Sequence, residues 1–157
     1  MTVMESRLWI DKVLEQHRHL RSEVDKLEKF LTAPRPTAGE KGSHTWAVDL
    51  SRRLLALHDE LFQHFRFEEQ VEARQEPFAR YPEAAQRLEE ALCEHPAMLQ
   101  ELRNIVSDVL SYSEGISPDD PQLRRRIARL IEWFHRHEEE ENHLIQRVEY
   151  RDVGAVD

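Results

Sequence analysis

Apolar residues recur every three or four positions in four long stretches of the chain, which is the period of an amphipathic helix. Segments with Pro, Gly or Ser interrupt these stretches and favour loops or turns. The pattern predicts helices over about 4–31, 45–74, 82–113 and 118–150. One medium and two short connections join them, so we expect an all-α, antiparallel up-down-up-down four-helix bundle.

The apolar residues of the four stripes are expected to form the core. They are Ile10, Val13, Leu20, Val24, Leu27 and Leu31; Leu50, Leu54, Leu57, Leu61 and Phe65; Leu88, Ala91, Met98, Leu102, Val106 and Val109; and Leu123, Ile127, Leu130, Phe134, Ile145 and Val148.

Several residues mark where the helices should begin or bend. Thr2 and Glu5 have the spacing of a capping box, and Ser117 is a candidate N-cap for the fourth helix. Pro82 suits the first position of the third helix. Pro96 lies inside that helix, where it removes a backbone hydrogen bond and should cause a kink.

Length, charge and cysteine content narrow the class of protein. The 157 residues suit one domain over 1–157, with few glycines (4). The net charge of −9 argues against a nucleic-acid partner. One cysteine excludes an internal disulfide, and no apolar run approaches the ~18 residues of a membrane span. We expect a cytoplasmic protein without membrane contact.

Six polar residues interrupt the apolar stripes and are expected to face inward. They are His17, His64, Glu68, His95, His137 and Glu141. Counting residues to the helix ends at ~1.5 Å each puts the four histidines at similar depth in an antiparallel bundle. They should therefore lie in one layer.

A single inward histidine is more often hydrogen-bonded structure than a metal ligand, but the two glutamates change this interpretation. A buried carboxylate is costly unless it is paired or metal-bound, and the stripes contain no Lys or Arg. Without cations, at least one of Glu68 and Glu141 should take up a proton. Imidazole with carboxylate suits iron, manganese or zinc, so the pattern favours a dinuclear metal site.

Other residues with reactive or ligating side chains are expected to lie outside this layer. In HEEEEN, Glu138 has a flank position, and Glu139 and Glu140 are solvated. Cys93 should be exposed. His58 is a flank residue, either structural or a substitute ligand.

The order of these elements resembles the hemerythrin-like, or HHE cation-binding, domain family. The contexts EQHRHL, HFRFEE and HRHEEE also resemble it, over roughly residues 5–150. The nearest alternative is the ferritin-like bundle, whose Glu-x-x-His signature has the carboxylate first. Here the histidine comes first in both His-x-x-x-Glu elements.

The resemblance implies two irons with an oxo or hydroxo bridge, with Mn or Zn as substitutes. It implies that His17 and His64 bind one metal, that His95 and His137 bind the other, and that Glu68 and Glu141 bridge. Oxygen carriers of the family have a second histidine where this chain has Leu99. Their last acid is an Asp five residues after the histidine, whereas Glu141 follows His137 by four.

These departures disfavour reversible O₂ carriage and favour the broader family roles in O₂, NO or redox sensing and iron handling. The expected partner is a small diatomic or peroxide ligand, with a protein partner for any signalling output. Two alternatives stay open: a di-iron peroxidase or oxidase on the same site, and a helical interaction module with a structural metal.

Overall fold

The protein is described from a computed structural model, which describes residues 3–34, 42–111 and 120–154. Within these ranges the chain forms six helices and no strand. The helices are α1 (Val3–Thr32), α2 (Ser43–Glu68), α3 (Val71–Phe78), α4 (Pro82–Leu92), α5 (His95–Ser111) and α6 (Pro121–Gly154).

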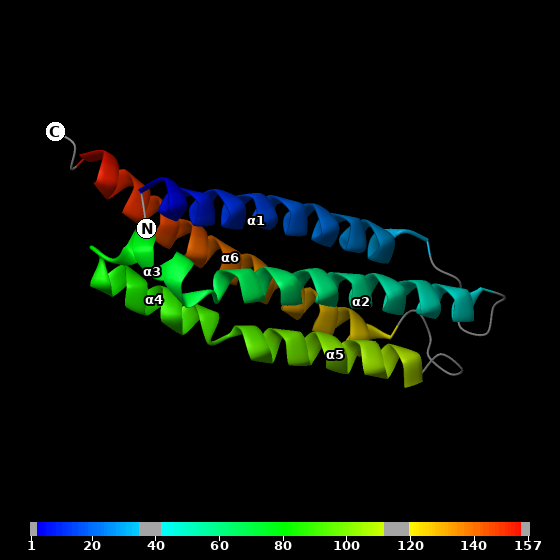
Figure 1. The fold of residues 1–157 in the computed structure, drawn as a ribbon. Coiled ribbons are helices and arrows are strands. Elements are labelled where there is room, and N and C mark those ends of the chain that lie inside the picture. The colour runs from blue at the N-terminus through cyan, green and yellow to red at the C-terminus, as the bar shows by residue number, and fades with distance from the viewer. Residues whose placement is uncertain (1–2, 35–41, 112–119, 155–157) are drawn as a thin grey trace.

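The six helices form four arms that run alternately in opposite directions (Figure 1). The first and last arms are the unbroken helices α1 and α6. The second arm is α2 followed by α3, and the third is α4 followed by α5. At one end of the molecule α3 packs on α1, and α4 packs on α6. The predicted all-α four-helix bundle is confirmed, with two of its arms interrupted.

The interruption of the second arm was not predicted. A continuous helix was expected to about Arg74, but α2 ends at Glu68 and α3 begins at Val71. Gln70 has an extended backbone (φ −63°, ψ 105°), which cannot continue a helix. The segment contains no Gly or Pro before Pro77, so the sequence carries no local stop signal there. The break lets Phe78 enter the core.

The third arm is broken where a kink was expected. The predicted helix over 82–113 is two helices, α4 from Pro82 and α5 from His95. Pro82 is the first residue of its helix, as predicted. Pro96 lies in the first turn of α5, where its missing N–H costs no helical hydrogen bond. The proline therefore begins a new helix rather than bending a continuous one.

The last helix begins later than expected. It starts at Pro121, not near 118, and Asp120 accepts a hydrogen bond from the Gln122 amide (3.0 Å), as an N-cap residue does. The helix continues to Gly154, beyond the expected end at about 150. The candidate caps Thr2 and Ser117 lie outside the described residues.

Two apolar clusters fill the bundle, and a polar layer separates them. The larger cluster runs from Leu20 to Leu27 on α1 and includes residues of α2, α5 and α6. The smaller one joins Trp9, Ile10 and Val13 to α3, α4 and the C-terminal part of α6. Every predicted stripe residue is buried except Leu31, which is partly buried against the larger cluster.

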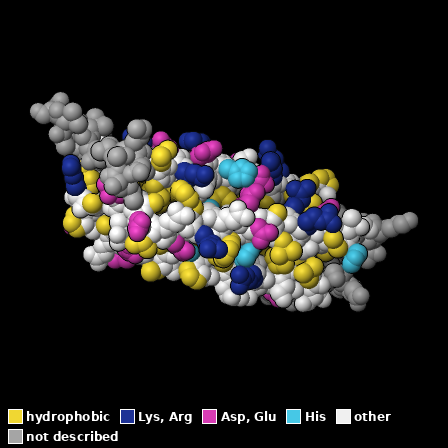
Figure 2. All heavy atoms as spheres, in the orientation of Figure 1, with side chains coloured by type: hydrophobic (Ala, Val, Ile, Leu, Met, Phe, Trp, Pro, Cys, Tyr) yellow, Lys and Arg dark blue, Asp and Glu magenta, His cyan; other side chains and the backbone are white. Residues whose placement is uncertain are grey.

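Charged side chains of both signs lie on the surface, together with exposed hydrophobic residues such as Leu8 and Val71. Figure 2 shows acidic and basic side chains interspersed over one face of the molecule. None of the helices in the described part of the chain is long and apolar enough to cross a membrane.

Candidate metal centre

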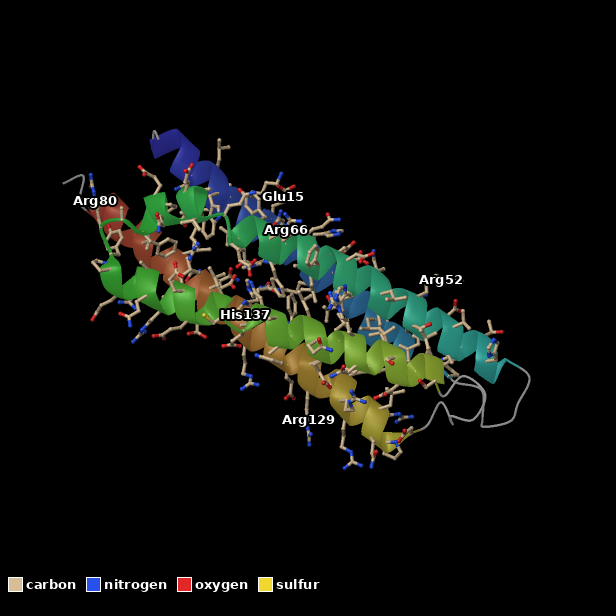
Figure 3. The ribbon with its side chains drawn as sticks, turned by 60° about the horizontal axis from the view of Figure 1, so that its bottom comes forward. Glu15, Arg52, Arg66, Arg80, Arg129 and His137 are labelled. Carbon is tan, nitrogen blue, oxygen red and sulfur yellow. The ribbon has the colours of Figure 1, made fainter. Side chains whose placement is uncertain are left out.

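The six inward polar residues predicted from the sequence converge in the layer between the two apolar clusters. They form two overlapping groups that could each hold a metal ion, His17–His64–Glu68–Glu141 and Glu68–His95–His137–Glu141. Within each group the ligand atoms lie within 4.8 Å of one another, and all the residues are buried. Figure 3 shows His137 among the helices, whereas Arg52 and Arg129 project outward. The predicted common depth of the four histidines is confirmed.

The four imidazoles all turn their Nε2 atoms toward the two carboxylates. His17 Nε2 lies 3.2 Å from Glu141 Oε2 and 3.6 Å from Glu68 Oε1. His64 Nε2 contacts Glu68 Oε1, one helical turn away. His137 Nε2 lies 2.5 Å from Glu141 Oε1, also one turn away. Each His-x-x-x-Glu element thus brings one nitrogen and one oxygen to the centre of the layer.

Both glutamates lie between the two histidine pairs. His95 Nε2 is 3.9 Å from Glu68 Oε2 and 3.6 Å from Glu141 Oε1. Glu68 therefore faces His64 and His17 with one oxygen and His95 with the other. Glu141 likewise uses Oε2 toward His17 and Oε1 toward His95 and His137. This is the position that a carboxylate shared by two cations requires.

The donor set fits two cations of the transition-metal type. Both oxygens of Glu68 and both of Glu141 are buried and lack a hydrogen bond of normal geometry. Leaving four carboxylate oxygens without partners would cost several kcal/mol, on the order of 1–3 for each group. Cations bound by imidazole and carboxylate would satisfy them, and such mixed sets suit iron, manganese or zinc.

In the metal-free protein, the two glutamates favour the protonated form of His17 and His137. Burial by itself lowers the pKa of His17, but Glu141 and Glu68 outweigh burial and raise it to about 10. Burial opposes the charged form of His137 too, but Glu141 above all raises its pKa. Burial acts to raise the pKa of Glu141, yet His137, His17 and His95 hold it well below its ordinary value.

The sequence predicted that at least one of Glu68 and Glu141 takes up a proton in the absence of metal. Glu141 is not that residue, because His137, His17 and His95 hold its pKa well below its ordinary value. The histidine His17 carries the proton instead. Metal binding therefore has to displace a proton from nitrogen rather than from oxygen.

The outer nitrogens of the first histidine pair bond to neutral amides. His64 Nδ1 lies 2.7 Å from Gln16 Oε1, and His17 Nδ1 lies 2.8 Å from Asn142 Oδ1. With Nδ1–H donating to the amide oxygen, the Nε2 lone pair is directed toward the metal position. Gln16 and Asn142 were not predicted as site residues, although each directly adjoins a predicted ligand in the sequence.

The outer nitrogens of the second pair face carboxylates instead. His95 Nδ1 lies 3.1 Å from Glu69 Oε1. His137 Nδ1 lies 3.9 Å from Glu94 Oε2, which accepts a hydrogen bond from the Trp133 indole. Glu69 is the second acid of HFRFEE, so the double acid was a signal that could have identified it. Nothing in the sequence placed Glu94 behind His137, because that contact depends on the break before His95.

Other sequence predictions near the centre have mixed outcomes. His58 was a candidate substitute ligand, but neither it nor Glu60, another acidic residue on α2, belongs to the two groups. His58 Nε2 accepts a hydrogen bond from Arg103 (3.0 Å), and Glu60 lies 3.3 Å from His19. Both are therefore engaged elsewhere.

The glutamates that follow His137 divide into exposed and inward-facing residues as expected, with one difference. Glu139 and Glu140 are exposed, but Glu138 is 1% exposed rather than merely at the flank. Its Oε1 accepts hydrogen bonds from Arg21 at 3.0 and 2.6 Å. This ion pair joins α6 to α1 beside the centre. Cys93 is exposed, as predicted.

A surface groove of about 330 Å³ reaches His95, one histidine of the second pair. Phe62, Phe65, Leu99 and Arg103 line it, and His95 forms part of its wall. Phe65 stacks on the His95 ring with centroids 3.6 Å apart, which holds the imidazole in place. Leu99, where the oxygen carriers have a further histidine, lines this groove together with His95.

A bundle with two such overlapping His–carboxylate groups defines a class of helical proteins suited to binding metal cations in the core. A family model, the hemerythrin HHE cation-binding domain, matches residues 9–148. The chain belongs to this family, and the resemblance noted from its motifs is confirmed. Comparison with curated proteins and with solved structures gave no match.

Proposed function

We propose that the protein binds two iron ions and, through them, a small oxidant such as O₂, NO or peroxide. His17 and His64 hold one iron, His95 and His137 hold the other, and Glu68 and Glu141 are shared by both. One observation carries the proposal: the two buried carboxylates direct four oxygens without hydrogen bonds at four inward Nε2 atoms. Membership of a cation-binding family supports it.

The residues around the centre have distinct tasks in this proposal. The outer hydrogen bonds that the histidines donate to Gln16, Asn142 and Glu69 keep each bonded imidazole oriented with Nε2 inward. The apolar clusters on either side keep bulk water out of the layer. Bound iron supplies electrons to the oxidant. The groove beside His95 gives a small molecule a short approach from solvent.

The second metal position lacks one protein ligand compared with the oxygen carriers. Leu99 cannot ligate, so that ligand position of the second metal is open to an exogenous molecule, and Leu99 lines the groove beside His95. This favours an iron that reacts with an oxidant over one that carries O₂ reversibly. It supports a role in sensing oxidants or in handling iron.

Metal analysis of protein expressed in iron-rich medium, with an optical spectrum, tests the proposal. About two irons per chain are expected. Peroxide or NO added to the reduced protein should change the spectrum, and sustained consumption of peroxide would favour an enzyme. A metal content near zero in a folded, iron-replete preparation would contradict the proposal.

A further inference from the structure

The two metal positions differ in what lies behind their histidines. Neutral amide oxygens face the outer nitrogens of His17 and His64. Carboxylates face those of His95 and His137. The inner ligands are nearly symmetrical, since each position has two imidazoles and the same two glutamates. The outer partners of the histidines are therefore one clear electrostatic difference between the positions.

A carboxylate and an amide affect a metal-bound imidazole differently. Both accept the Nδ1–H bond and orient the ring. A carboxylate also brings a full negative charge and forms a charge-assisted bond that draws the proton outward. The imidazole then becomes a stronger electron donor to its metal. Negative charge near a metal stabilises its more oxidised, more positive state.

The two helix breaks place these carboxylates. Glu69 is the C-cap residue of α2, directly after the bridging Glu68 and before the extended Gln70. Glu94 lies in the short gap between α4 and α5. The amides behind the first pair come from the unbroken helices α1 and α6. The interruptions of the second and third arms thus place a negative charge behind each histidine of the second pair.

The two carboxylates are not equivalent. Glu69 is at hydrogen-bond distance from His95 Nδ1, while Glu94 is 3.9 Å from His137 Nδ1. Their side chains are 45% and 38% exposed, so solvent screens both charges. Arg66 lines the groove beside Glu69 and adds further screening. Glu69 is therefore the main contributor, with a modest effect.

We propose that Glu69, assisted by Glu94, makes the iron at His95 and His137 harder to reduce than the iron at His17 and His64. The proposal rests on the di-iron function above. Glu69 and Glu94 are positioning residues that act through their histidines and touch no metal. When dithionite supplies electrons one at a time to the diferric protein, the first electron should reduce the His17–His64 iron, and the second should reduce its partner.

A mediated redox titration of the iron-loaded protein, followed by Mössbauer and EPR spectroscopy, tests this order. Two irons that share carboxylates can have different reduction potentials even when their outer partners are the same. The variants therefore test whether Glu69 contributes to the difference. Glu69→Gln should raise the lower potential by about 59 mV, the equivalent of about tenfold in a one-electron equilibrium. Gln16→Glu places a carboxylate behind His64 and should lower the higher potential. Glu72→Gln is the matched control. It removes one negative charge on the exposed side of α3 and should change neither reduction potential.

The outcomes separate this inference from the function on which it rests. Iron content near zero in the unchanged protein would overturn both. Two irons per chain, with potentials in Glu69→Gln no different from those in Glu72→Gln, would overturn this inference alone. If Glu69→Gln loses an iron, its potentials cannot be compared, and the Gln16→Glu variant becomes the test. If the higher of the two reduction potentials in Gln16→Glu is the same as in the unchanged protein, the inference is overturned.

Discussion

His95 and His137 point their Nε2 atoms at each other across the bundle, 3.0 Å apart. Two ring nitrogens at this distance need either a shared proton or a cation, because two lone pairs or two N–H groups would repel. The same nitrogens face Glu68 and Glu141. The pair therefore supplies two nitrogens to one of the two groups that could hold a metal ion.

Removing one of these imidazoles should remove one metal. We expect His137→Ala to retain about one iron per chain instead of two, because only one histidine would remain at that position. His64→Ala should have the same effect on the other position. Iron analysis after gel filtration measures it.

The matched controls are histidines on the same helices that point outward. His143 on α6 and His19 on α1 are exposed, so alanine at either position should leave the iron content unchanged. If the exposed histidines mattered as much as the buried ones, the assignment of the site would be wrong.

The raised pKa of His17 predicts how stability depends on pH. In the metal-free protein it is about 10, against about 6.5 in the unfolded chain. The proton on His17 therefore stabilises the metal-free fold fully below pH 6.5, and this contribution is lost as the pH rises through about 10. Chemical denaturation of chelator-treated protein should show a falling free energy of unfolding between pH 6.5 and 10.

Metal binding should have the opposite pH dependence. Because a metal displaces the His17 proton, its affinity should rise with pH across the same window. Competition between metal and protons thus begins below about pH 10, well above the imidazole reference value. Stabilisation by metal follows RT ln(1 + [M]/Kd), ~4 kcal/mol at a thousandfold excess over Kd. Melting curves with and without chelator at pH 9 and pH 6.5 should differ more at pH 9; an equal difference would contradict proton competition.

The pair of Glu138 with Arg21 predicts a change in stability without a loss of metal. Arg21→Ala would leave a 1% exposed carboxylate without its donor, and should lower the free energy of unfolding by about 1–3 kcal/mol. Arg18, an exposed neighbour on α1, gives a matched control in Arg18→Ala. Denaturation and iron analysis should show a less stable protein that still binds two irons. If Arg21→Ala lost iron and Arg18→Ala did not, the ion pair would also support the metal centre.

The sequence predicted the contents of the polar layer because helical period and depth determine which side chains meet. His17 and Glu141 each lie between apolar residues of a regular stripe, so their inward direction follows from the spacing alone. The four-arm arrangement follows from the same pattern and the short connections. These features depend on residues close in sequence.

The interruptions and outer contacts could not be predicted in the same way. The break at Gln70 has no Gly or Pro beside it, and it depends on how α3 packs across α1. The contact of Gln16 with His64 joins two helices, so their relative rotation determines it. Such contacts belong to tertiary packing, which a stripe does not specify.

Leu99 provides the last prediction. It follows His95 by one helical turn and lines the same groove, where a histidine would add a ligand to the second metal. Leu99→His should therefore tighten metal retention against a chelator by about tenfold, the lower end of what one change around a metal site brings. It should also slow the oxidation of the reduced protein in air. Leu110→His places the same residue at an exposed site further along α5 and should change neither measurement. Reversible O₂ cycling by the unchanged protein over many rounds would show that the missing histidine is not what separates this chain from the carriers.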